Sequence, residues 1–213
     1  MSEPARRVLV LDMGNVLLSL DGEAILRGQG VDDPEDIRVF LQTVLGSSVW
    51  HAYDRGTADK TAFLPVIEQL PAHLRAKARE MVIEKCFALE YMDRIPQTLD
   101  LAERALAAGY PVYLLSNAGQ DFYIYRRKLP ELADFSGLFI SSDWRLLKPE
   151  PEIFRTFLAH FGLRAGDCVF VDDVPANIAG AKDAGMDGIC FNATREPIER
   201  LYAQLKEKGI VLC

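Results

Sequence analysis

RVLVLDMGNVL, residues 7–17, decides the fold, because it opens as a short apolar run and then stops abruptly. The run of Val and Leu predicts a buried strand. Asp12 stands where the run ends, and Met13, Gly14 and Asn15 break the pattern as a turn does. Ligands of an open parallel sheet bind outside the carboxyl ends of its strands. Asp12 is therefore placed as a nucleophile or a metal ligand, or else as an aspartate that ends the strand by bonding nearby backbone amides.

Length and charge limit the classes of function. The chain has 213 residues, of which 49% are hydrophobic and 26% charged, and this suits one globular domain or one domain with a sizeable insertion. The formal net charge is -7 and the basic residues are scattered, so we expect neither nucleic acid nor a membrane as a partner. Residues 1–7 lack the apolar region of a signal peptide, and no apolar run approaches the length of a membrane span.

The cysteines form no Cys-x-x-Cys pair and stand at Cys86, Cys168, Cys190 and Cys213. Cys168 and Cys190 lie in apolar runs, which is typical of small core residues. We therefore expect neither disulfides nor a zinc site, and we predict a cytoplasmic location.

Residues 21–95 show helical periodicity and no convincing strand. Asp33-Pro34-Glu35-Asp36 is typical of a helix start, with an N-cap residue, a proline at the first position and acids in the first turn. Further helices are predicted over 57–70 and 72–87. The block predicts a small helical bundle inserted after the first strand, and we assign residues 21–94 to a helical cap.

Strands and helices alternate from residue 95 onward. Strands are predicted over 112–115, 138–140, 168–171 and 188–191, and helices over 98–108, 121–129, 151–161, 177–184 and 197–208. This alternation implies a parallel sheet with right-handed crossovers. The predicted fold class is therefore α/β, with a Rossmann-like parallel-sheet core built from residues 1–20 and 95–213.

Polar residues stand at the carboxyl ends of three of these strands. They are, in chain order, Asp12, Ser116 with Asn117, and Asp172 with Asp173. Lys148 stands just ahead of the helix predicted over 151–161. A parallel sheet would bring these ends to one edge. The joint order carries the argument, because each residue alone is also typical of a turn, a surface lysine or a helix N-terminus.

This set of side chains fits phosphoryl transfer assisted by magnesium. Mg²⁺ prefers one or two carboxylates together with substrate phosphate and retained water, and the aspartates at two strand ends would supply the carboxylates. Ser116 and Asn117 can donate hydrogen bonds to phosphoryl oxygens, and Lys148 can neutralise charge that develops on them. A carboxylate can also attack phosphorus and form an aspartyl phosphate.

Four motifs resemble those of the haloacid dehalogenase-like hydrolase superfamily. They are VLDMGNVL around Asp12, LLSN ending at Asn117, KPEPEIF beginning at Lys148, and FVDDVPANI around Asp172. The resemblance covers nearly the full length and implies that the helical block is the family's α-helical cap. The Asp-x-Gly-Asn-Val opening resembles the subgroup that contains bacterial phosphatases active on glucose 1-phosphate, and also the N-terminal phosphatase domain of soluble epoxide hydrolase.

The resemblance implies a metal site. Asp12 would be the nucleophile and a metal ligand, and the backbone carbonyl of Gly14 would be a second ligand. Asp173 would be the third, because the Asn-Ile-Ala-Gly-Ala-Lys that follows aligns it with the family's metal-binding aspartate. Asp172 and Asn177 would be auxiliary groups.

The resemblance also implies that Ser116, Asn117 and Lys148 hold the transferring phosphoryl group, with Ser116 and Lys148 acting beside Asp12 in catalysis. Gly14 departs from most phosphatases of the superfamily, which carry an aspartate there as general acid and base. Such help is worth about 10²–10⁴-fold. We therefore expect slow release of a poor leaving group such as a sugar alkoxide, and a smaller effect for acyl or aryl phosphates.

A residue of the cap, or water, could substitute for the missing acid. The candidates are His51, Asp54 and Asp21. His51 beside Trp50 is also typical of a packed cap residue, and Asp54-Arg55-Gly56 of a turn between cap helices. Arg145 is a second departure, since the related pattern usually has Gly there, and it is either a surface residue or an extra cation near the phosphate.

These observations leave three hypotheses for function. The first is a magnesium-dependent phosphatase of small phosphorylated metabolites, with sugar phosphates as one candidate class, whose cap excludes water during an aspartyl-phosphate reaction. The second is a phosphate-binding or regulatory module with little turnover, because Gly14 replaces the acid. The third is a haloacid dehalogenase, which needs the nucleophile but no magnesium and is disfavoured by Asp172-Asp173. Residues 50–57 are predicted to decide the substrate, residues 122–125 are predicted to be core, and the oligomeric state stays open.

Overall fold

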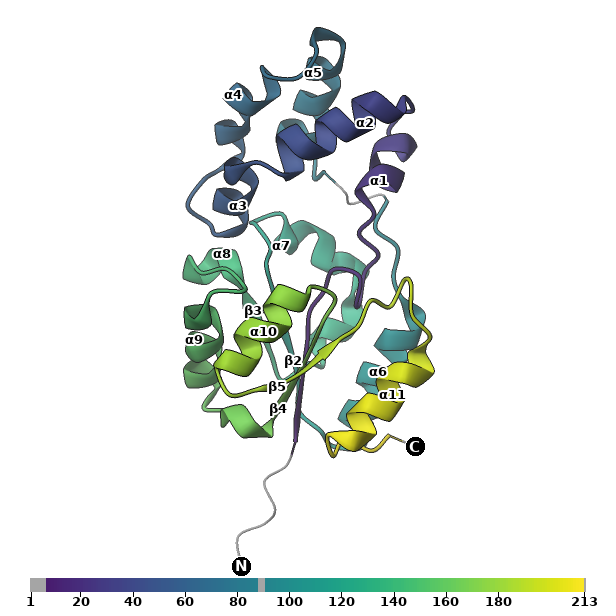
Figure 1. Ribbon diagram of the computed structural model, residues 1–213, viewed down its shortest axis with the longest axis vertical. Coiled ribbons are helices and arrows are strands. Elements are labelled where there is room, and N and C mark those ends of the chain that lie inside the picture. Colours follow the sequence, from purple (N-terminus) through teal and green to yellow (C-terminus); the bar gives the residue numbers. More distant parts are fainter. Residues whose placement is uncertain (1–6, 88–90, 213) are drawn as a thin grey trace, which may run out of the picture.

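A computed structural model describes residues 7–87 and 91–212 of the chain. Its centre is a sheet of five parallel strands (Figure 1), namely β1 (Val8–Leu11), β2 (Val112–Ser116), β3 (Gly137–Ile140), β4 (Cys168–Asp172) and β5 (Asp187–Cys190). The order across the sheet is β3-β2-β1-β4-β5. β1 is the middle strand, and Leu11 is in register with Leu114 of β2 and with Val171 of β4. The prediction of an α/β fold with a Rossmann-like parallel sheet is confirmed.

Helices cover both faces of the sheet, because successive side chains of each strand point to opposite faces. Leu9 and Leu11 share one core cluster with Leu99 and Leu205, whereas Val10 packs in a second cluster. The first face is covered by α6 (Pro96–Ala107) and α11 (Ile198–Glu207), and the second by α9 (Pro151–Phe161) and α10 (Pro175–Asp183) (Figure 1). No helix among the described residues is long and apolar enough to cross a membrane.

Residues 22–84 form a helical segment beyond the carboxyl ends of the strands (Figure 1). All of these residues are described, and none lies in a strand. The helices are α1 (Gly22–Gly28), α2 (Pro34–Phe40), α3 (Ser48–Asp54), α4 (Leu64–Ile67) and α5 (Ala72–Arg79), with π-helical turns at Leu41–Leu45 and Glu80–Glu84 and a 3₁₀ turn at Lys60–Phe63. The assignment of residues 21–94 to a cap and of the rest to a core stays a prediction.

The helix start at Asp33 is as predicted, because its side chain accepts hydrogen bonds from the backbone N–H groups of Glu35 and Asp36. A continuous helix over 57–70 is wrong. The side chain of Asp59 caps the 3₁₀ turn instead, and Pro65 stands at the start of α4, where its missing N–H group does no harm.

The helix predicted over 121–129 is also shorter than expected. It ends as α7 (Phe122–Tyr125) with a 3₁₀ turn at Arg126–Lys128, because Pro130 disfavours helical backbone at Leu129. Phe122 is buried as predicted, but Tyr123 and Ile124 are exposed. The structure adds three short helices for which the sequence pattern predicted no range, α1, α3 and α8 (Ser141–Trp144).

The C-terminal end of α3 fixes the helical segment to the core. The hydroxyl of Ser141 donates to the carbonyl oxygen of Asp54 at 2.6 Å, and Gly119 N donates to the Asp54 carboxylate at 3.1 Å. Gly56 follows with a φ of 74°, and a Cβ there would lie 2.2 Å from the carbonyl oxygen of Ser142. Only glycine permits this close approach. Of the cysteines, Cys168 is buried as expected, and Cys213 lies outside the described residues; the cytoplasmic location stays a prediction.

Candidate functional site

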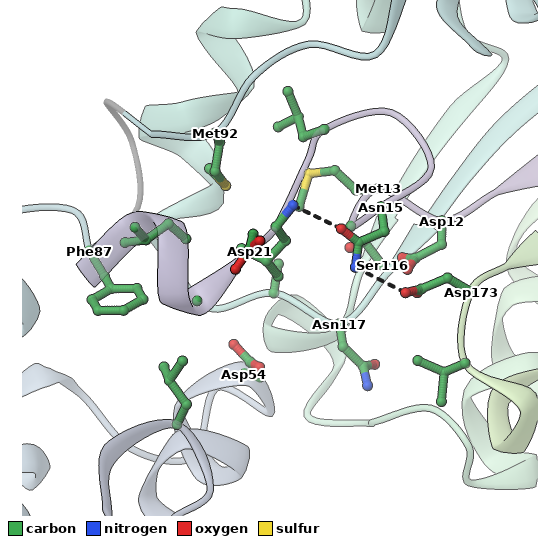
Figure 2. A pocket seen from close by; sticks show the side chains of 18 of the residues that line it. Asp12, Met13, Asn15, Asp21, Asp54, Phe87, Met92, Ser116, Asn117 and Asp173 are labelled. Carbon is green, nitrogen blue, oxygen red and sulfur yellow. Dashed lines mark hydrogen bonds between the residues drawn. The ribbon is translucent and has the colours of Figure 1, made fainter. Parts of the chain in front are cut away.

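A pocket of about 680 Å³ lies between the strand ends and the helical segment (Figure 2). Most residues singled out from the sequence line it, namely Asp12, Gly14, Ser116, Asn117, Lys148, Asp173 and Asn177. Asp172 lies fully buried beneath this group and contacts Lys148. The parallel topology therefore brings residues 12, 116, 148 and 172 together, although they are far apart in the chain.

Lys148 is the centre of the polar floor. Its ammonium Nζ lies 2.8 Å from Asp12 Oδ1 and 2.6 Å from Asp172 Oδ2, and it donates to the carbonyl oxygen of Leu115 at 3.0 Å. The side chain of Asn117 holds the lysine backbone, since Lys148 N donates to Asn117 Oδ1 at 2.8 Å and Asn117 Nδ2 donates to Lys148 O at 2.9 Å. Both polar atoms of the Asn117 side chain are thus engaged in positioning Lys148.

Burial sets the charge state of the nucleophile candidate. Loss of water raises the pKa of Asp12 to about 7, although the attraction of Lys148 opposes this shift. Burial alone would lower the pKa of Lys148, but the attraction of Asp12 and Asp172 raises it overall. The ammonium is therefore charged, and any further positive charge at this edge would favour the ionised, nucleophilic form of Asp12.

Asp172 is saturated by hydrogen bonds. Its oxygens accept from Lys148 Nζ, from Val174 N at 2.8 Å and from Asn177 Nδ2 at 3.0 Å. These donors replace the water that burial removes from the carboxylate. It acts on the pocket through Lys148.

The carboxylates fit a hard divalent cation. Asp12, Asp172 and Asp173 each place an oxygen within 4.8 Å of the others. With all three ionised, one lysine leaves two negative charges uncompensated. Oxygen donors of this kind suit Mg²⁺. Because Asp172 is already engaged, Asp12 and Asp173 are the carboxylates available to a cation, and Gly14 lines the same part of the pocket.

Sequence reasoning missed two asparagines that hold Asp173. Asn15 Nδ2 donates to Asp173 Oδ2 at 3.0 Å, and Asn192 Nδ2 donates to the same oxygen at 3.3 Å (Figure 2 shows the Asn15 bond). Asn15 has a φ of 52° and also accepts from Leu20 N at 2.9 Å. Asparagine tolerates this left-handed conformation. Asn192 follows β5 as Asp12 follows β1, so the strand-end pattern contained a signal for it.

Three residues were candidates to replace the acid missing at Gly14. His51 is exposed, does not line the pocket, and places Nδ1 3.0 Å from the carbonyl oxygen of Ser47. Asp21 lines the pocket, but its Oδ1 caps α1. Asp54 lines the pocket, and burial raises its pKa to about 6 despite the hydrogen bonds from Gly119 N and the Trp50 side chain.

Arg145 and Arg55 do not line the pocket. Arg145 is exposed at the end of α8, in a left-handed conformation with a φ of 57°, and does not line the pocket. Arg55 pairs with Glu150, with Nη1 2.9 Å from Oε2. Arg145 is therefore a surface residue, and Arg55 belongs to the contact between the helical segment and α9.

Comparison with known proteins agrees with this geometry. The family of haloacid dehalogenase-like hydrolases matches residues 7–185. Flavin mononucleotide hydrolase 1 of Arabidopsis thaliana is 27% identical over 76% of the chain, which spans 62% of that protein. Sesquiterpene phosphatase astK of Aspergillus oryzae is 23% identical over 86% of the chain and 88% of its own length.

The fold is also found among solved structures. A haloacid dehalogenase-family enzyme of Bacteroides thetaiotaomicron, solved in complex with magnesium and inorganic phosphate, superimposes with a TM-score of 0.67 at 21% identity. The match covers 92% of this chain and 99% of the other.

Proposed function

The chain belongs to the haloacid dehalogenase-like hydrolases, and we propose that it is a magnesium-dependent phosphatase of small phosphorylated metabolites. The observation that carries the proposal is the buried ion pair of Asp12 with Lys148, at 2.8 Å, beside the Asp173 carboxylate. A nucleophile, a fixed cation and a second carboxylate are the parts that phosphoryl transfer requires. The phosphatases among the relatives support the same reaction class.

The proposed reaction has two steps. A carboxylate oxygen of Asp12 bonds to phosphorus while the ester oxygen leaves with its electron pair, which gives an aspartyl phosphate and an alcohol. Water then attacks phosphorus and releases Asp12 and inorganic phosphate. Lys148 neutralises charge on the phosphoryl oxygens, and the buried Ser116 at the end of β2 holds the group in line. Mg²⁺ held by Asp12, Asp173 and the Gly14 carbonyl would supply further charge neutralisation.

We assign the proton donor to Asp54 of α3. It lines the pocket, unlike His51, and its carboxylate is not used as a helix cap, unlike that of Asp21. A pKa of about 6 suits a group that must give a proton to the leaving alkoxide and then accept one from water. The helical segment would thereby supply what Gly14 lacks.

Two further expectations belong to this proposal. The Asp-x-Gly-Asn-Val opening resembles that of the subgroup that contains bacterial sugar-phosphate phosphatases, and this resemblance makes sugar phosphates one candidate substrate class. The dehalogenase alternative lacks a role for Asp173, which the asparagines Asn15 and Asn192 hold beside Asp12. The binding-module alternative rests on Gly14 alone, and Asp54 weakens it.

The test is phosphate release from p-nitrophenyl phosphate and a panel of metabolite phosphates, with magnesium or with chelator. We expect magnesium-dependent turnover that Asp12→Asn abolishes, while the exposed Asp183→Asn leaves it unchanged. A single burst of phosphoenzyme without turnover would favour the binding module. Release of halide from a haloalkanoate in chelator would favour the dehalogenase.

A further inference from the structure

The pocket has two unlike sides. Its floor holds Asp12, Asp173 and Lys148, whereas the opposite wall consists mainly of apolar side chains from the helical segment and the chain around Met92, with the carboxylates of Asp21 and Asp54 among them (Figure 2). The larger apolar side chains of this wall are Leu18, Leu20, Ile25, Leu41, Leu45, Trp50, Tyr53, Phe87, Met92 and Tyr125. A volume of about 680 Å³ greatly exceeds what a phosphoryl group needs. The space next to this wall can therefore accommodate a large leaving group.

Several polar groups of the wall are already paired within the protein. Asp21 caps α1, Asp54 accepts from Gly119 N, and Asp121 pairs with Lys60 Nζ at 2.9 Å. The Tyr53 hydroxyl accepts from Asp121 N at 3.2 Å. A sugar in this space would bury hydroxyl groups against apolar side chains with few partners, and an unpaired buried hydroxyl is unfavourable.

Charge at the wall also disfavours an anionic leaving group. The wall carries the carboxylates of Asp21, Glu23, Asp54 and Asp121. Among the described lining residues, the cations are Lys148, which is engaged on the floor, and Arg195, which is exposed. Glu23 is paired with Arg27 and Asp121 with Lys60. A second phosphate or a carboxylate on the leaving group would therefore meet mainly the carboxylates of Asp21 and Asp54 and would find no free cation among the described residues of the wall.

The apolar surface continues to the mouth. Leu20 and Val174 line the pocket and yet are 48% and 43% exposed, which places them where the pocket opens to solvent. Apolar side chains are therefore present both at the rim and in the wall.

From these features we propose that the substrate is a phosphate monoester with a bulky, uncharged, apolar leaving group. The inference rests on the proposed phosphatase function and narrows it. The floor recognises the phosphoryl group of any such ester, and the wall selects the alcohol by burial of apolar surface.

The test compares esters with the same kind of leaving group. Hexyl phosphate and glucose 6-phosphate both release a primary alkoxide, so the need for a proton donor cancels. We expect kcat/KM to favour hexyl phosphate by at least about 10²-fold, and to rise about three- to fourfold per methylene from butyl to octyl phosphate, as burial of CH₂ groups gives. Equal or faster hydrolysis of glucose 6-phosphate, or no dependence on chain length, would overturn the proposal.

Substitutions in the wall locate the effect. Leu41→Gln and Leu45→Gln lie in the π-helical turn after α2, and both side chains are only partly buried. We expect each to lower kcat/KM for octyl phosphate about tenfold and to leave acetyl phosphate, which is too short to reach the wall, unchanged. Val49→Gln is the matched control, because Val49 is a partly buried residue of α3 that does not line the pocket. Equal loss on both substrates would contradict a selective wall.

Two readouts separate this inference from the proposed function. Magnesium-dependent turnover of acetyl phosphate reports the phosphatase activity alone. The Kd values of octylphosphonate and methylphosphonate, which are not hydrolysed, report the wall alone. Tighter binding of octylphosphonate supports an apolar ligand even where nothing turns over, and equal Kd values overturn it.

Discussion

The floor and the wall of the pocket are built on different principles. The floor is made of strand ends, and its side chains hold each other through short bonds, such as Lys148 Nζ to Asp172 Oδ2 at 2.6 Å. The wall is made of short helices and turns, and packing holds it, with Trp50 and Phe63 ring centroids 5.7 Å apart. Asp54 is a residue of the wall, and it is also the proposed proton donor. The difference indicates that the floor fixes the reaction and the wall chooses the substrate.

Removal of Lys148 should have the largest effect, because the whole floor meets at its ammonium. Lys148→Met leaves Asp12 and Asp172 buried without their shared cation, and we expect the free energy of unfolding in chelator to fall by about 3–5 kcal/mol. Loss of its charge at the phosphoryl site should lower kcat by at least about 10²–10³-fold. Urea unfolding and steady-state kinetics measure the two effects.

The exposed Lys182→Met is the control for a lost surface charge, and it should change neither quantity by much. Addition of magnesium should recover part of the stability of Lys148→Met, since a divalent cation also neutralises Asp12. If Lys148→Met kept full activity, the floor would not be the reaction centre.

The floor could be predicted from the sequence because parallel strands end at one edge. The polar residues after residues 8–11, 112–115 and 168–171 needed only that rule to be placed together. Each of these strands is a short, continuous apolar run, which can be recognised in the sequence without knowledge of its tertiary contacts. Asn192 directly follows the strand predicted over 188–191, so the same rule would have placed it at this edge, but its bond to Asp173 is visible only in the structure.

The wall could not be predicted in the same way. Helical periodicity showed that residues 21–95 were helical, but it did not place the breaks at Asp59 or after Phe40, which depend on capping and on a π-helical turn. Leu41 and Leu45 lie in the π-helical turn that follows Phe40, and this turn helps to direct their side chains into the pocket. The pKa of Asp54 is raised by burial in the folded chain and is opposed by the hydrogen bond from Gly119 N, 65 residues further along the chain. Such tertiary contacts leave no local pattern.

Asp54→Asn tests the chemical contribution of the wall, with a smaller effect than Lys148→Met. The amide can still accept from Gly119 N but cannot donate the proton, so we expect about a 10²-fold loss of kcat/KM on alkyl phosphates. The effect has a pH signature. A general acid must be protonated, and the pKa of Asp54 is about 6. The ratio of wild-type to variant rates should therefore be highest below pH 6 and should fall above it.

Ionisation of the substrate affects the wild-type and variant rates equally, so it cancels in their ratio. Acetyl phosphate serves as an internal reference, because its leaving group needs no proton, and its kcat/KM, which reports formation of the aspartyl phosphate, should change little. A ratio that does not vary between pH 5 and 8 would assign Asp54 a structural role and leave the proton to water.

Gly14→Asp introduces a candidate general acid on the floor, which could replace Asp54 of the wall. A Cβ at this position would meet only Leu20 Cδ2, at an ordinary 3.6 Å, so a side chain fits. In the Asp54→Asn background we expect a gain of about tenfold on hexyl phosphate and little change on acetyl phosphate. Gly14→Asn, of the same shape, is the control and should give no gain. A gain from the asparagine would show that shape, and not proton donation, is responsible.

Arg55→Met should have the smallest effect, although Arg55 joins the wall to the core. Its pair with Glu150 is partly exposed, at 31% and 42%, and surface pairs contribute about 0.2–1 kcal/mol. The hydrogen bonds from Gly119 N to the Asp54 carboxylate and from Ser141 Oγ to the Asp54 carbonyl oxygen, together with the close approach of Gly56 to Ser142, stay in place. We therefore expect urea unfolding to shift by less than about 1 kcal/mol and the ratio of hexyl phosphate to glucose 6-phosphate hydrolysis to stay constant. A fall in that ratio would mean that the ion pair keeps the wall closed over the floor, and that substrate choice depends on docking of the helical segment as well as on its apolar side chains.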